Sequence, residues 1–300
     1  MDLQKYKEEL EQINENRRPC DQVFLNTEGE APFVEVAGFQ EIPGISHGFS
    51  CRLGGVSQGI YESMNLGLYL EDKRENVMEN YRRLANSMGM DYRRISCPNQ
   101  VHDTRVLVVE EEDAGDGITR PLSHQNIDAQ ITNVKGLPLI VYWADCVPVL
   151  FVDPVKQVIG SAHAGWRGTL GGIVAKTVDK MGEVYGSNPK DIHALIGPSI
   201  GVDNYEVDEP VMEGLRSCSF LTGDLEDFEA KGLFVTGQRE GRYLFNLQKI
   251  NQAILEEAGL EKEKIYQSHL CTMAHHDIFF SHRYTQGKRG LNGGLIQLTK

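Results

Sequence analysis

The stretch over residues 137–169, LPLIVYWADCVPVLFVDPVKQVIGSAHAGWRGT, decides the fold class and carries the most informative side chains. It predicts one apolar strand interrupted by Ala144-Asp145-Cys146, a turn at Asp153-Pro154, a second strand and a Gly-containing loop at 163–168. Apolar runs of this length are typical of strands buried on both faces. Acids and thiols rarely stand side by side in buried strands without a chemical role, so Asp145 and Cys146 mark a candidate site.

Outside this stretch, predicted strands and helices alternate irregularly. The predicted strands lie at 22–26, 33–37, 46–51, 93–97, 105–110, 128–132, 192–196, 264–269 and 294–298. The predicted helices lie at 2–16, 73–89, 169–185, 207–217 and 246–258, and residues 219–233 resemble a surface excursion. This order predicts a mixed-sheet α/β or α+β fold rather than a doubly wound one. Without a repeat or linker, we expect a single domain over 22–300, preceded by an N-terminal extension over 1–21.

Composition limits the partners of the protein. The 300 residues carry 30 basic and 43 acidic side chains, a net charge of −13, which argues against nucleic acid and anionic membranes as partners. The charged N-terminus has no signal-peptide core, and no apolar run reaches the roughly 18 residues of a membrane span. Six cysteines without a CxxC pair indicate reduced thiols, so we expect a cytoplasmic protein. Protein partners are not indicated by the sequence.

Three side chains of soft or borderline character stand beside predicted strands: His102, Cys146 and His163. A thiolate with two imidazoles suits zinc, and three protein ligands leave a fourth position for water or substrate, as in catalytic sites. A bound zinc lowers the pKa of water towards about 7, and Asp145 is then a candidate proton acceptor or donor.

Two other interpretations of the same residues stay open. Cys146 can be the nucleophile of a metal-free hydrolase or deamidase, with either histidine as the base. It can also be a small buried hydrophobe with no chemistry. One cysteine and two histidines resemble a blue-copper ligand set as well, so copper is an alternative to zinc.

Eight motifs, in order and covering nearly the whole chain from about residue 45, resemble the YfiH family of laccase-domain proteins. They are RLGGVS at 52–57, SMNLG at 63–67, NQVH at 99–102, DAQIT at 128–132, ADCVPV at 144–149, HAGWRG at 163–168, IGPSIGVDNYEV at 196–207 and FFSHR at 279–283. The resemblance implies a single sandwich-like domain, related in fold to the deamidase domain of cytotoxic necrotizing factor. It also implies zinc bound by the matching His102, Cys146 and His163.

The resemblance further implies a purine nucleoside enzyme. Such an enzyme splits adenosine, inosine or guanosine with phosphate, releasing the base and ribose 1-phosphate, and also deaminates adenosine. Purine nucleoside and phosphate are the expected small-molecule partners. Arginines hold phosphate through bidentate bonds, and neutral side chains add hydrogen bonds. The residues expected to bind substrate or phosphate in this way are Arg52, Ser57, Asn65, Gln100 and Arg167.

Other names used in the family imply other functions. They are copper-dependent polyphenol oxidase and peptidoglycan-precursor editing enzyme, and a non-catalytic nucleoside-binding regulator is a further alternative. The nine histidines include no His-x-His pair, which argues against a laccase copper cluster. The segment FFSHRYTQGKRG departs from the FFSYRR pattern of the family. Cys271, His275 and His276 suggest a second metal site as an alternative, but we expect residues 271–290 to form a loop bordering the pocket.

Overall fold

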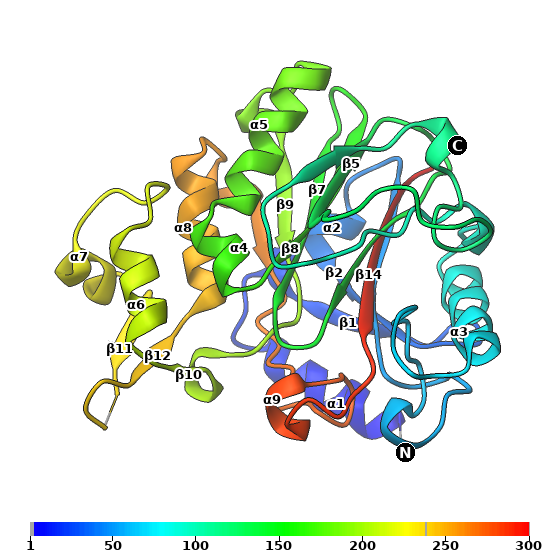
Figure 1. The fold of residues 1–300 in the computed structure, drawn as a ribbon, viewed down its shortest axis with the longest axis horizontal. Helices are drawn as coiled ribbons and strands as arrows, with labels where there is room; N and C mark the ends of the chain where they lie inside the picture. The colour runs from blue at the N-terminus through cyan, green and yellow to red at the C-terminus, as the bar shows by residue number, and fades with distance from the viewer. Residues whose placement is uncertain (1–2, 238, 300) are drawn as a thin grey trace.

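The computed structural model describes residues 3–237 and 239–299, and its centre is a pair of sheets packed face to face. Helices cover both outer faces, with α3 on one side and α4, α5 and α8 on the other (Figure 1). The mixed α/β prediction is confirmed by this arrangement. None of the described helices combines the length and the apolar character that crossing a membrane requires.

The first sheet has five antiparallel strands in the order β1-β2-β3-β14-β6. The strands are β1 (Val23–Asn26), β2 (Phe33–Val36), β3 (Ile45–Ser50), β14 (Asn292–Leu298) and β6 (Leu139–Trp143). The helix α1 (Leu3–Asn14) packs beside β1 and buries Tyr6 and Leu10 in the same apolar cluster as Val23. The domain boundary expected after residue 21 stays a prediction.

The second sheet has six strands in the order β13-β9-β7-β8-β5-β4, with parallel pairs only at its two edges. The strands are β13 (Ile265–Gln267), β9 (His193–Ile196), β7 (Val147–Asp153), β8 (Val158–Ala164), β5 (Ala129–Thr132) and β4 (Val106–Val108). A small third sheet joins β10 (Glu206–Val207), β12 (Tyr243–Phe245) and β11 (Phe234–Thr236). Sequence analysis did not predict this third sheet.

Nine helices accompany the strands in the part of the chain that the structure describes. After α1 they are α2 (Ala37–Gln40), α3 (Arg74–Ser87), α4 (Trp166–Leu170), α5 (Ile173–Tyr185), α6 (Glu209–Arg216), α7 (Leu225–Ala230), α8 (Leu247–Glu257) and α9 (His282–Thr285). The region predicted as a surface excursion contains α7, whose Phe228 is buried in the core beneath α8. Most other side chains of the segment are exposed, so it lies at the surface and the apolar Phe228 anchors it.

Alternation of side chains explains why the central strands are apolar throughout. In β6, Val141 and Trp143 face the second sheet, whereas Ile140 and Tyr142 pack under α3. In β7, Leu150 shares the inter-sheet cluster with Val141. Successive residues of a strand point to opposite faces, so a strand between two packed layers needs an apolar residue at every position. Each large apolar side chain buried in this way contributes about 1.5–3 kcal/mol.

The single interrupted strand predicted at 137–153 is wrong in one decisive respect. β6 ends at Trp143 in the first sheet, and β7 begins at Val147 in the second. Ala144-Asp145-Cys146 therefore form the link that carries the chain from one sheet to the other. Asp145 has φ 85°, in the left-handed region that aspartate tolerates better than most residues.

Three further expectations need correction. Residues 93–97 are not a strand: a 3₁₀ turn at Tyr92–Arg94 precedes one isolated bridge from Ser96. The loop predicted at 163–168 is the end of β8 followed by α4. The helix predicted at 169–185 is broken before α5, because Gly172 adopts φ 75°, and a side chain there would collide with the Phe220 ring.

Candidate metal centre

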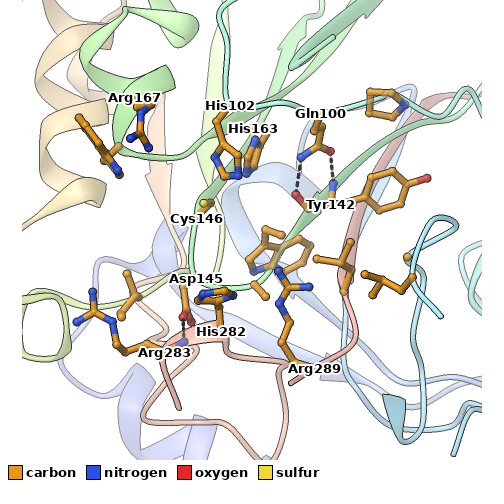
Figure 2. A pocket seen from close by; sticks show the side chains of 18 of the residues that line it. Gln100, His102, Tyr142, Asp145, Cys146, His163, Arg167, His282, Arg283 and Arg289 are labelled. Atoms are coloured by element: carbon orange, nitrogen blue, oxygen red, sulfur yellow. Dashed lines mark hydrogen bonds between the residues drawn. The ribbon is translucent and has the colours of Figure 1, made fainter. Parts of the chain in front are cut away.

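A cavity of about 570 Å³ opens where the link between the two sheets meets α4 and α9. This volume is within the range of small-molecule sites. Its wall includes His102, Cys146 and His163 together, although they are 44 and 17 residues apart in sequence (Figure 2). One nitrogen or sulfur atom from each of these residues lies within 4.8 Å of the others.

Strand register brings two of these residues together. In the antiparallel pair of β7 and β8, Val147 faces Ala164 and Pro148 faces His163. Cys146, directly before Val147, is therefore held next to the end of β8. His102 arrives from a loop before β4, and its ring meets that of His163 edge to face at 4.7 Å. A thiolate and two imidazoles at this spacing can bind a metal ion and leave a coordination position open.

Asp128 organises the centre, and sequence analysis gave it no role. Its carboxylate accepts a hydrogen bond of 2.9 Å from Nδ1 of His163. It also accepts hydrogen bonds from the backbone N–H groups of Val101, His102 and Asp103 at 2.9–3.0 Å. The first contact leaves Nε2 of His163 free for a metal, and the others fold the loop that presents His102, which has φ 63°. Carboxylates behind ligating histidines fix ring orientation and tautomer.

Charges within the centre shift three pKa values. Burial alone would raise the pKa of Asp128, but hydrogen bonds from His163 and the backbone lower it overall. Burial would also raise the pKa of the Cys146 thiol, yet the facing His163 and His102 lower it to about 6. Burial opposes the charge on His163, but Cys146 and Asp128 raise its pKa to about 9. Both directions favour a thiolate on Cys146 beside an imidazolium on His163 when no metal is bound.

Gly165 has no side chain, and this allows His102 and Cys146 to approach its backbone closely. A Cβ on Gly165 would lie 2.7 Å from Nδ1 of His102 and 3.1 Å from Sγ of Cys146. Its φ of −67° and ψ of 168° are open to alanine, so Gly165→Ala does not strain the backbone. We expect this variant to stay folded and to lose about 10–100-fold in metal affinity, as measured by competition with a chromophoric chelator. Gly182→Ala, in α5 and outside the cavity wall, is the matched control, and equal affinities of the two variants would contradict the prediction.

Asp145 lies beside the centre but points away from it (Figure 2). One carboxylate oxygen accepts a hydrogen bond of 2.6 Å from Oγ1 of Thr272, and the other accepts one of 2.6 Å from the backbone N–H of Arg283. Both oxygens therefore tie the link between the sheets to the C-terminal segment. The geometry favours a positioning role for Asp145, and its proton-transfer role stays a prediction.

Three residues expected to bind phosphate lie elsewhere. Arg52, Ser57 and Asn65 are not among the described residues that line the cavity. The Arg52 guanidinium donates to two backbone carbonyls, while Ser57 and Asn65 both donate to Asp72. Their Gly-flanked motifs hold two loops together, and this internal bonding accounts for the polar residues that sequence analysis assigned to a ligand.

Gln100 and Arg167 do line the cavity, as the prediction requires. The Gln100 side-chain amide forms two hydrogen bonds with the backbone of Tyr142. Its Nε2 donates to the carbonyl oxygen at 2.8 Å, and its Oε1 accepts from the N–H at 2.7 Å. Arg167 stacks over the ring of Trp166, 4.1 Å from its centroid.

The segment expected to border the pocket does so through His282, Arg283 and Arg289. Sequence analysis gave these three no binding role, and the Gly-flanked GKRG around Arg289 was the available signal.

Comparison with known proteins agrees with this geometry. A sequence model of the family described as multi-copper polyphenol oxidoreductase laccase matches residues 46–299. The chain belongs to this family. This laccase-domain protein also shares its fold with Bacillus licheniformis hypothetical protein YfiH, with a TM-score of 0.83 and 33% identity over 92% of this chain and 99% of that one. The resemblance to YfiH proteins is confirmed.

Two curated relatives of this laccase-domain protein have names that state an activity. Purine nucleoside phosphorylase YlmD of Bacillus subtilis (strain 168) is 38% identical over 244 residues, 81% of this chain and 84% of that protein. Adenosine deaminase RL5, from an unknown prokaryotic organism, is 32% identical over 248 residues, 82% of this chain and 90% of that protein. The names of these relatives indicate that the laccase-domain chain is an enzyme.

The family description mentions several coppers, and the donor set can be compared with it. Among the described residues, His102, Cys146 and His163 are the one group of three or more potential ligands close enough to share an ion. Such a group fits a single metal ion. It does not fit a cluster of several coppers, which needs many more imidazoles.

Proposed function

We propose that this protein is a zinc-dependent purine nucleoside phosphorylase that also deaminates adenosine. The observation that carries the proposal is the His102, Cys146 and His163 group in the wall of a cavity that also exposes arginines. The names of the two curated relatives support the two reactions. The net charge of −13 makes a local basic wall the natural place for a phosphate dianion.

Within this proposal, His102, Cys146 and His163 hold the metal, and Asp128 keeps His163 in the ligating tautomer. A bound zinc supplies Lewis-acid polarisation in that part of the cavity. The apolar part of the wall, formed by Leu68, Tyr69 and Leu291 among others, offers contact to the faces of a purine. The remaining polar groups orient ribose and phosphate.

A second candidate function is a metal-free hydrolase or deamidase. One observation favours it: the facing His163 and His102 lower the pKa of Cys146 to about 6, as in an activated cysteine nucleophile. Such an enzyme loses activity on thiol alkylation and is indifferent to chelators. The zinc enzyme instead loses activity with a chelator and recovers it with added zinc.

Elemental analysis and product detection test the proposal. We expect one zinc per chain in the purified protein, and adenine, inosine and ribose 1-phosphate after incubation with adenosine and phosphate. Zinc-loaded protein that forms none of these products would overturn the proposal. Copper-loaded protein that oxidises a phenol while zinc-loaded protein remains inert would assign the site to polyphenol oxidation.

A further inference from the structure

Three arginines line the cavity, and two of them are engaged by their neighbours. Arg167 is exposed and stacks over Trp166. Arg283 is also exposed, lies over the Tyr205 ring at 5.2 Å and donates to the backbone carbonyl of Glu206 at 3.2 Å. Both guanidinium groups are exposed and contact neighbouring groups of the protein, so neither is a buried charge without a partner.

Arg289 is different. Its side chain is half-buried and reaches up into the cavity from the segment after α9 (Figure 2). Its Nε atom is buried without a hydrogen-bond acceptor, and no described carboxylate forms an ion pair with its guanidinium. Burial lowers the pKa of Arg289, with only partial compensation from the nearby Cys146 and Asp145. A partly buried guanidinium whose Nε has no acceptor is stabilised when an anion binds to it.

Among the described residues that line the cavity, none accepts a hydrogen bond from Arg289. Asp145 is the one carboxylate among the described residues that line it, and both its oxygens are used by Thr272 and the backbone of Arg283. The five N–H donors of a guanidinium match the oxygens of a phosphate in bidentate geometry. A phosphate dianion therefore has the charge and shape of the missing partner.

We propose that Arg289 holds the inorganic phosphate that attacks the nucleoside, an assignment that rests on the proposed phosphorylase function. A phosphate oxygen forms a bond to C1′ of the ribose while the C1′–N9 bond breaks. The bonding electron pair leaves with the purine, and the proton of HPO₄²⁻ is transferred to the departing base. The products are the free base and ribose 1-phosphate dianion, so atoms and charge balance.

The same assignment places the two reactions at different parts of the bound nucleoside, with deamination at the base and phosphorolysis at the ribose. Deamination adds water at C6 of the base and releases ammonia, and it needs no phosphate. The base then lies by His102, Cys146 and His163, and the phosphate lies by Arg289. Removing Arg289 should consequently impair phosphorolysis and leave deamination intact. If Arg289 only supported the fold, its removal would impair both reactions.

Two variants of zinc-loaded protein test this separation. Arg289→Met preserves much of the side-chain volume and removes the charge, whereas Arg289→Lys keeps the charge without the bidentate fork. We expect Arg289→Met to raise KM for phosphate about 30-fold or more, and to leave phosphate-free conversion of adenosine to inosine within about threefold of the parent. Arg289→Lys should be intermediate for phosphate. Arg93→Met is the control. Arg93 is exposed, pairs with Asp91 and lies outside the cavity wall, so its replacement should change neither reaction.

Calorimetric titration with inorganic phosphate provides a readout that does not depend on turnover. The parent protein should bind phosphate, and Arg289→Met should not. An unchanged KM for phosphate in Arg289→Met, or an equal loss of phosphorolysis and deamination, would overturn the assignment. Parent protein that performs neither reaction would instead refute the proposed function. AMP that binds through Arg289 and excludes phosphate would assign the site to a nucleotide 5′-phosphate and overturn the role of free phosphate.

Discussion

Cys146→Ala is expected to empty the metal centre and to abolish both phosphorolysis and deamination. Cys146 provides the only sulfur of the three-residue group, and its removal leaves two histidines of which His102 is exposed. Replacing a ligand should cost more than the roughly 10–100-fold in metal affinity that is typical of outer-shell changes. Zinc content after gel filtration and product formation from adenosine measure the two effects.

The loss should be local, because Cys146 lies in the link between the sheets and is only partly buried at the edge of the inter-sheet core. We expect the far-ultraviolet circular dichroism spectrum of Cys146→Ala to match that of the parent. Cys218→Ala is the matched control, since Cys218 is buried in the helical core away from the cavity and its variant should retain zinc. Cys146→Ala protein with full zinc and no activity would instead identify Cys146 as a nucleophile. Full zinc and full activity would exclude both roles.

Asp128→Asn is expected to weaken both the fold and the metal site. The carboxylate of Asp128 has no exposed surface and accepts from three backbone N–H groups and from His163. An amide in its place loses the charge and one acceptor, so buried donors are left without a partner. We expect a loss of about 2–4 kcal/mol in the free energy of unfolding, measured by urea denaturation. Metal affinity should fall about 10–100-fold, because His163 is no longer held in its tautomer.

The effect of Asp128→Asn on stability should depend on pH. The pKa of Asp128 is lower in the folded protein than in the unfolded chain, where it is about 3.9. The carboxylate therefore stabilises the fold above that value, and its contribution disappears as the pH falls towards the folded pKa. The difference between parent and variant should be full at pH 7 and shrink below about pH 4.

Asp153→Asn separates general stability from the metal site. Asp153 is fully buried and accepts from the backbone N–H groups of Val155 and Lys156, and it forms no described hydrogen bond to His102 or His163. Its variant should be destabilised and bind metal as the parent does. If Asp128→Asn kept the metal affinity of Asp153→Asn, the proposed control of His163 by Asp128 would be refuted.

Much of the candidate site could be predicted from the types of residue beside the predicted strands. A thiol and two imidazoles beside apolar strands predicted His102, Cys146 and His163, and the structure brings these three together. Asp128 was missed because an acid before a short strand is an ordinary loop residue. Its partner becomes evident only when β5 pairs with β8, where Ala129 faces Ala162 and Asp128 lies beside His163.

Arg52, Ser57 and Asn65 lie outside the cavity wall for a related reason, and their expected binding role stays a prediction. Polar side chains in Gly-rich turns can bind a ligand or bond to the turn itself, and the local sequence is the same in both cases. In this protein the partners are other protein groups: Arg52 donates to backbone carbonyls, and Ser57 and Asn65 donate to Asp72. The Gly-flanked GKRG around Arg289 resembles an ordinary surface turn, and only the buried Nε without an acceptor distinguishes Arg289 from a surface arginine.

The sequence by itself determined the types of most elements and the chemical types of the candidate metal ligands. Apolar periodicity and donor atoms are properties of short segments, so they need no distant partner to be recognised. The tertiary structure alone decided that Ala144-Asp145-Cys146 cross between two sheets, because β6 and β7 are equally apolar and only their pairing partners differ. It also decided which charged groups meet in the cavity, since contacts between segments far apart in the chain depend on strand register and on how the two sheets pack.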